Sequence, residues 1–165
     1  MSRVLMTTDG SDFALRAGRR AATLLAPDCE ITVLRVVGHH VPGAMGAETV
    51  ALIPDPAVVE ESERPEQREA AGDVDALMAA LPKPAEARIE RGDPGVVTCK
   101  LADEGAFDLI VVGSHGHGLI KRMLIGSGSN HVLRHAPAPC SWYANRNRMM
   151  RDGARHAVIS RPGWN

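Results

Sequence analysis

Short apolar runs that alternate with segments of helical periodicity constrain this chain more than any other feature. The runs cover residues 4–8, 30–37 and 107–112, and Val, Ile and Leu dominate them. Strands that are continuously apolar, with amphipathic helices between them, are typical of a parallel sheet that helices cover on both faces. The pattern therefore predicts an α/β domain.

The segments between the runs carry apolar residues at helical spacing. They predict a helix over residues 12–26 with Ser11 or Asp12 as its N-cap, a second over residues 65–81, and a third over residues 94–104. In the second helix a proline stands first, where its missing N–H costs nothing. These helices separate the strands, as a parallel connection requires.

Two further segments complete the pattern. Residues 85–90 predict a weak strand, whereas residues 38–64 hold several prolines and glycines without a clear period and are predicted to form a long loop. In parallel sheets, ligands bind outside the carboxyl ends of the strands, where the strand order reverses. Chemistry is therefore expected near residues 7–11, 36–40, 91–94 and from residue 113 onward.

Composition excludes several classes of function. Net charge is -1, with 19 basic and 20 acidic residues, so no global field attracts nucleic acid or an anionic membrane. Aromatic residues are only 3%, too few for stacking platforms along a nucleic-acid strand. No apolar run approaches the length of a membrane span. We expect neither nucleic acid nor membrane as a partner.

The cysteines and the N-terminus indicate a compartment. Cys29, Cys99 and Cys140 are far apart and form no CxxC pair, which argues against a disulfide framework or a four-ligand zinc site. Residues 1–12 contain no apolar signal segment. We therefore expect a cytoplasmic protein with ordinary thiols.

A glycine-rich segment follows the strongest predicted strand. Gly113 and Gly116 are separated by two residues, and nine further residues lead to Gly126 and the run 127–129, Ser-Gly-Ser. A helix is expected to begin there, and a helix N-terminus with free N–H groups binds anions. The string matches neither the phosphate loop GxxxxGK[ST] nor the dinucleotide fingerprint GxGxxG. The segment therefore predicts a phosphate cradle of another kind.

The spacing G-x2-G-x9-G-S on strand, loop and helix resembles the nucleotide-binding motif of the universal stress protein family. Asp9-Gly10-Ser11 after the first strand, the end of the second strand over residues 34–37, and HVLRHAPAP over residues 131–139 resemble the same family. The resemblance covers roughly residues 3–140. It implies a single Rossmann-like domain of the adenine nucleotide α hydrolase type, with a five-stranded parallel sheet between helices.

The resemblance also implies bound ATP, or ADP or AMP in its place, and a set of binding residues. Asp9 would bond the ribose hydroxyls. The adenine pocket would be lined by Thr7, Val36 and Val112. Ribose and phosphates would lie against Gly113, Gly116, Gly126, Ser127, Gly128 and Ser129.

Each of these assignments has a plainer alternative. Asp9 could be only a helix N-cap, Val36 and Val112 only core residues, and the glycines only a surface loop. His115 and His117 form an HxH pair, but zinc would require two more ligands nearby. We expect no protein ligand set for a metal and no catalytic residue, although charge favours Mg²⁺ beside the phosphates.

Three functions stay open on the sequence alone. The favoured one is an ATP-binding regulatory protein of the stress response. The second is an interaction module that has the same fold and does not use a nucleotide. The third is a slow ATPase, although no P-loop lysine or pair of acids for hydrolysis is visible.

The C-terminal end departs from the family pattern. The expected fifth strand over residues 139–144 is short and lacks β-branched residues, which puts the homodimer that the resemblance implies in doubt. Residues 145–165, with five arginines and one aspartate, match nothing in the family core. The sequence thus predicts a nucleotide-binding domain over residues 1–144 and an atypical basic tail over residues 145–165.

Overall fold

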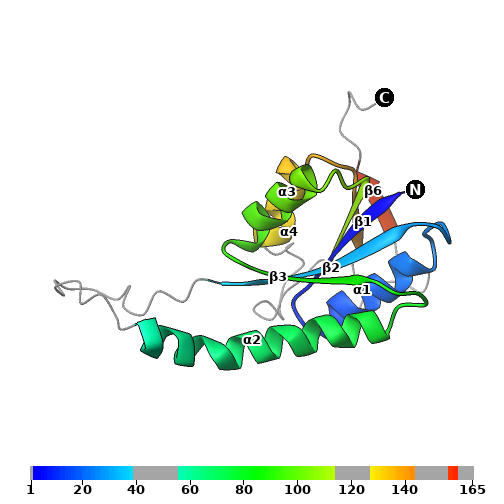
Figure 1. Ribbon diagram of the computed structural model, residues 1–165. Coiled ribbons are helices and arrows are strands. Elements are labelled where there is room, and N and C mark those ends of the chain that lie inside the picture. Colours follow the sequence, from blue (N-terminus) through cyan, green and yellow to red (C-terminus); the bar gives the residue numbers. More distant parts are fainter. Residues whose placement is uncertain (1, 39–55, 114–126, 144–155, 160–165) are drawn as a thin grey trace, which may run out of the picture.

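The computed structural model describes residues 2–38, 56–113, 127–143 and 156–159. Within these ranges the chain forms a sheet between two layers of helices (Figure 1). In chain order the elements are β1 (Arg3–Thr8), α1 (Asp12–Ala22), β2 (Glu30–Val37), α2 (Pro56–Ala79), β3 (Glu86–Arg91), α3 (Pro94–Glu104), β4 (Leu109–Gly113), α4 (Ser127–His135), β5 (Cys140–Tyr143) and β6 (His156–Ile159).

The strand order is β3-β2-β1-β4-β5-β6, and the first five strands in this order are parallel. The predicted Rossmann-like fold with a five-stranded parallel sheet is therefore confirmed. β1 lies between β2 and β4, with Met6 opposite Val33 on one side and Val111 on the other. Because the chain first builds outward to β3 and then returns to β4, the strand order reverses between β1 and β4. This reversal is where an open α/β sheet offers a crevice.

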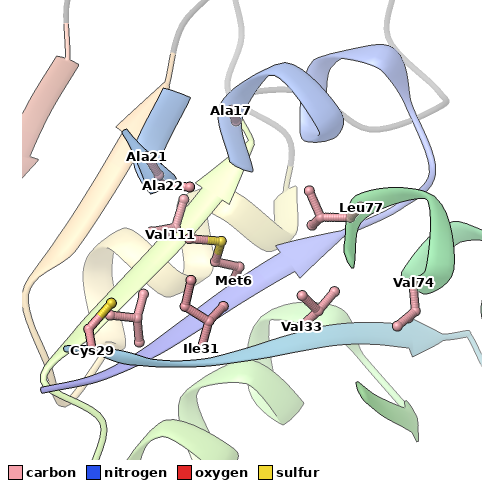
Figure 2. Close-up of a cluster of buried hydrophobic side chains, with 11 residues drawn as sticks. Met6, Ala17, Ala21, Ala22, Cys29, Ile31, Val33, Val74, Leu77 and Val111 are labelled. Carbon is pink, nitrogen blue, oxygen red and sulfur yellow. The ribbon is translucent and has the colours of Figure 1, made fainter. Parts of the chain in front are cut away.

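One face of the sheet packs on α1 and α2. Figure 2 shows Met6 of β1 between Ala17 and Ala21 of α1 and the α2 residues Val74 and Leu77. All five side chains are buried. The small alanines let α1 approach the sheet closely, and Leu77 fills the space beside them.

The opposite face packs on α3 and α4, which lie together on the other side of the sheet (Figure 1). Leu5 of β1 and Ile110 of β4 point into this layer, where Ala102 of α3 and Val132 of α4 cover them. Leu5 and Ile110 are completely buried, as is Met6 on the other face. Successive residues of β1 therefore enter different cores, as the alternation of side chains along a strand requires.

Two helix starts follow the local sequence. Ser11 caps α1, and its hydroxyl accepts a hydrogen bond from the Ala14 N–H at 3.2 Å. Asp93 caps α3 in the same way, with Oδ1 2.9 Å from the Val96 nitrogen and Pro94 in the first turn. Of the two N-caps that the sequence allowed for α1, Ser11 and Asp12, the structure uses Ser11. Asp9 is therefore not the N-cap of α1.

The prediction for residues 56–64 was wrong. We expected a loop up to Arg64 and a helix starting at Pro65, but α2 begins at Pro56 and runs through Pro65 to Ala79. Pro56 takes the first-turn position, and the glutamates that follow are good helix formers, so one interior proline does not end the helix. Residues 39–55, the rest of the expected loop, lie outside the described ranges. No helix in the described ranges is long and apolar enough to cross a membrane.

A sixth strand was not predicted. Residues 156–159, inside the expected tail, form β6, which pairs antiparallel with β5. The short fifth strand CSWY does form and pairs with β4 from Ile110 to Gly113. The sheet therefore extends one strand beyond the parallel core.

Leu77 offers a direct test of the α2 packing. Leu77→Ala is expected to lower the free energy of unfolding by about 2–5 kcal/mol, because it leaves a cavity at a fully buried site. Leu24→Ala is the control, because Leu24 is 52% exposed and its truncation is expected to cost roughly 0.5 kcal/mol or less. Urea unfolding of both variants measures the difference, and equal losses would contradict the packing.

Candidate functional site

A pocket opens at the carboxyl edge of the sheet, at the reversal between β1 and β4. Its volume is about 230 Å³. Residues from β1, β2 and β4 and from the helices α1, α3 and α4 converge on it, although they are distant in sequence. The lining comprises Thr7, Thr8, Asp9, Ala14, Leu34, Arg35, Val36, Pro94, Thr98, Val112, Gly113, Ser127, Gly128, Ser129 and Val132.

Eight of the ten residues predicted to bind a nucleotide line this one pocket. The structure thus brings together parts of the motif that lie more than a hundred residues apart. Their role toward a nucleotide stays a prediction. The other two, Gly116 and Gly126, lie outside the described residues, as do His115 and His117.

The two carboxylate oxygens of Asp9 differ, because Oδ1 accepts hydrogen bonds and Oδ2 has no partner among the described residues. Oδ1 accepts hydrogen bonds from the Ser11 hydroxyl at 2.6 Å and the Ser11 N–H at 3.1 Å. Oδ2 is buried and accepts no hydrogen bond from any described residue. Burying a charged acceptor in this way is costly unless something supplies a donor. The carboxylate is therefore fixed in place and still able to accept from a ligand.

The turn that presents Asp9 requires a glycine. Gly10 has a φ of +80°, a left-handed conformation that side chains disfavour. A Cβ at this position would stand 2.0 Å from Oδ1 of Asp73, which is on α2. The Gly10 N–H donates to the Thr8 hydroxyl at 3.1 Å, which closes the turn. The carboxylate of α2 thus rests directly on the peptide that follows Asp9.

Asp73 also holds Arg35, a pocket residue that the sequence analysis did not assign. Its Oδ2 lies 2.9 Å from Nε of Arg35, and both side chains are about four-fifths buried. Nη1 of Arg35 donates to the Val36 carbonyl at 2.7 Å. Among the described residues that line the pocket, Arg35 and Asp9 are charged. The pair joins α2 to the end of β2 beside the site.

The N-terminus of α4 closes the pocket from the side of β4. Ser127, Gly128 and Ser129 form its first turn. The Ser129 hydroxyl donates to the Gly113 carbonyl at 2.7 Å, so it ties the helix start to the end of β4. A Cβ on Gly128 would stand 3.3 Å from Cβ of Pro94, so glycine permits α3 and α4 to approach here. The free N–H groups of this turn supply partial positive charge at the pocket.

The rest of the wall is apolar. Leu34 and Val36 from β2 and Val112 from β4 are buried, and so is Ala14 at the start of α1. These side chains belong to the core and to the pocket at once. A flat, weakly polar ring fits such a wall better than a charged group does. The pocket therefore has an apolar part beside β2 and an anion-attracting part at α4.

The residues that the structure describes form no centre for metal or thiol chemistry. In the described part of the chain, no three His, Cys, Asp or Glu side chains gather as metal ligands would. The cysteines Cys29, Cys99 and Cys140 are free. Burial raises the pKa of the Cys140 thiol to about 11, with Cys99 adding a smaller upward effect. A thiol with such a pKa is almost wholly protonated at neutral pH and is a poor nucleophile.

A Rossmann-like domain with this carboxyl-edge pocket defines the class of protein, and comparison with known proteins gives the family. The universal stress protein family model matches residues 1–141. A protein named as a universal stress protein in Staphylococcus haemolyticus is 42% identical over 53 residues, which span 32% of each chain. One from Staphylococcus aureus strain USA300 is 29% identical over 136 residues, 81% of this chain and 78% of that relative.

Solved structures share the fold. The protein MJ0577 superposes with a TM-score of 0.69 at 22% identity, over 89% of this chain and 98% of that one. A universal stress protein crystallised in complex with cAMP superposes with a TM-score of 0.58 at 25% identity, over 86% of this chain and 94% of that one. The chain belongs to the universal stress protein family.

The contact between Gly10 and Asp73 predicts a coupled pair of substitutions. Gly10→Ala is expected to cost roughly 1–2 kcal/mol of stability for its left-handed backbone, and a further penalty because the methyl group displaces Asp73. In an Asp73→Ala background only the backbone cost remains. A double-mutant cycle by chemical denaturation is expected to give a coupling of about 0.5–3 kcal/mol. Strict additivity would contradict the contact.

Proposed function

We propose that this protein is a regulatory adenine-nucleotide binder of the stress response, with ATP as the preferred ligand and ADP or AMP as alternatives. The observation that carries the proposal is the pairing of two features in one pocket. The buried, unpartnered Oδ2 of Asp9 needs a hydrogen-bond donor, and the first turn of α4 needs an anion. A nucleotide supplies both, as ribose hydroxyls and as phosphates.

The phosphates would lie at the N-terminus of α4. The N–H groups of Ser127, Gly128 and Ser129 are the donors there, because the first turn of a helix leaves them unused. The Ser129 hydroxyl already donates to Gly113, so we assign it to positioning of the turn. Gly113 then brings the end of β4 close to the ribose. Gly116 and Gly126 keep the phosphate role that the family motif implies.

The adenine ring would lie against the apolar wall. Val36 and Val112 are the predicted contacts, and Leu34 beside them enlarges the surface. Thr7, whose hydroxyl donates to the Val111 carbonyl at 3.4 Å, lines the same end of the pocket. The cAMP complex of a relative supports an adenine-containing ligand for this wall.

Binding rather than catalysis is the function that the pocket supports. In the described part of the chain its charged lining residues are Asp9 and Arg35, which bond to Ser11 and Asp73 respectively. Mg²⁺ would balance the phosphate charge, with its ligands supplied by phosphate oxygens and water. We place the protein in the cytoplasm, where a reducing environment suits three free cysteines.

The test is calorimetric titration of the purified protein with ATP, ADP, AMP and cAMP. Asp9→Asn keeps an acceptor for Ser11 and removes the charge that the ribose hydroxyls would meet. A hydrogen bond to a charged group contributes about 1.5–3 kcal/mol, so the dissociation constant for ATP is expected to rise roughly ten- to hundred-fold. Asp12→Asn is the matched control, because Asp12 is exposed on the first turn of α1 and does not line the pocket.

A different result would favour a different function. Equal affinities of the Asp9 and Asp12 variants would contradict the ribose role of Asp9. No heat with any nucleotide would favour the nucleotide-independent interaction module. Steady phosphate release from ATP that disappears in Asp9→Ala would instead identify a slow ATPase.

A further inference from the structure

We propose that Arg35 is a ligand-binding residue, through which the pocket binds an adenine nucleotide with a phosphate on a ribose hydroxyl more tightly than the same nucleotide without it. This inference rests on the proposed function and names the ligand class more closely. The binding residues that the family resemblance implies do not include Arg35, although Arg35 lines the pocket. Its guanidinium gives the pocket a positive group separate from the first turn of α4.

Two nitrogen atoms hold the Arg35 guanidinium in place. Nε lies 2.9 Å from Oδ2 of Asp73, and Nη1 donates to the Val36 carbonyl at 2.7 Å. A guanidinium carries its N–H groups in a rigid fork, and those on Nη2 have no partner among the residues that the structure describes. The side chain is 20% exposed and borders the pocket. The two bonds therefore fix the fork and leave one edge of it able to donate to a ligand.

The strand order places Arg35 and the start of α4 on opposite sides of Asp9. β1, which ends just before Asp9, lies between β2 and β4. Arg35 of β2 is opposite Thr8 in the β1–β2 register. On the other side, the Ser129 hydroxyl ties the first turn of α4 to Gly113 at the end of β4. A ribose at Asp9 would therefore have the phosphate-binding turn on one side and the guanidinium on the other.

Arg35 also lies apart from the wall proposed for adenine. Its neighbours Leu34 and Val36 belong to the core cluster that α3 and α4 cover. Arg35 instead bonds to Asp73 on α2, which packs on the opposite face of the sheet. A base against Leu34 and Val36 would thus lie on the other face from the fork. The part of a nucleotide nearest to Arg35 would be the ribose and any group attached to its hydroxyls.

A phosphorylated ribose matches the chemistry of Asp9 and Arg35 together. Oδ2 of Asp9 needs a hydrogen-bond donor, and the guanidinium fork binds the paired oxygens of a phosphate especially well. A nucleotide with one phosphorylated and one free ribose hydroxyl supplies both groups. Dinucleotide-binding domains follow the same chemistry, because an arginine near the ribose accommodates a 2′-phosphate there.

The experiment is calorimetric titration of the full-length protein, at one fixed ionic strength, with AMP, adenosine 2′,5′-bisphosphate and adenosine 3′,5′-bisphosphate. The bisphosphates differ from AMP only in the additional phosphate. A hydrogen bond to a charged group changes affinity by roughly ten-fold or more. The wild type is therefore expected to bind at least one bisphosphate about ten-fold more tightly than AMP.

Two variants remove the guanidinium. Arg35→Gln is the direct change, and Arg35→Gln/Asp73→Asn removes both charges of the pair, so that no carboxylate is left buried without its cation. Arg88→Gln is the matched control, because Arg88 lies on the neighbouring strand β3, is 48% exposed and does not line the pocket. Far-UV circular dichroism and thermal unfolding check that each variant is folded.

The ratio of the AMP and bisphosphate dissociation constants separates ligand binding from a purely structural role. Arg35→Gln and the double variant are expected to lose the preference for the bisphosphate, whereas Arg88→Gln keeps it. If the pair only joined α2 to β2, the Arg35 variants would change in stability and keep the wild-type ratio.

The wild type alone separates this inference from the proposed function. Equal binding of AMP and both bisphosphates would overturn the inference and leave the proposed function standing, whereas no binding of any adenine nucleotide would overturn both. A preference that survives in the Arg35 variants, or that Arg88→Gln removes equally, would contradict the assignment to Arg35.

Discussion

The reversal of strand order between β1 and β4 is the constraint on which the rest of this structure depends. Both strands are central and buried on both faces, with Leu5, Met6 and Ile110 inaccessible to solvent. The helices that follow β1 and β4 leave toward opposite faces of the sheet, since α1 joins one layer and α4 the other. The crevice between them results from the order of the strands and the sides on which the helices pack. It does not depend on which side chains line it.

The site uses that crevice at a cost to stability. A buried acceptor without a partner, such as Oδ2 of Asp9, destabilises a protein by about 1–3 kcal/mol. The turn at Gly10 and the hydrogen bonds from Ser11 hold the carboxylate in this orientation. Such an arrangement is understandable if a ligand supplies the missing donor. A bound nucleotide would then account for the buried oxygen that has no hydrogen-bond donor in the described part of the protein.

Local signals explain why much of this could be predicted from sequence. The buried strands, the cap at Ser11 and the Ser-Gly-Ser turn that begins α4 depend on neighbouring residues, and each pattern has a physical meaning of its own. The convergence of Asp9 with the α4 turn followed from parallel topology together with the family resemblance.

The features that escaped prediction depend on tertiary contacts or on competing local rules. Arg35 and Asp73 are separated by 38 positions, and no local sequence pattern predicts that they form an ion pair. Pro65 stands inside α2, although a proline is more often found in the first turn of a helix, so the sequence alone did not place the start of α2. β6 has the composition of an ordinary short strand, but only its partner β5 gives it a place in the sheet.

The central claim is that the pocket at the β1–β4 reversal holds an adenine nucleotide. The most direct measurement is mass spectrometry of the small molecules released when protein purified without added nucleotide is denatured. The account predicts ATP, ADP or AMP in a substantial molar ratio to the chain, and its loss from protein carrying Gly128→Val, which crowds the α4 turn against Pro94. Equal recovery of nucleotide from that variant, or a different class of molecule from the wild type, would contradict it.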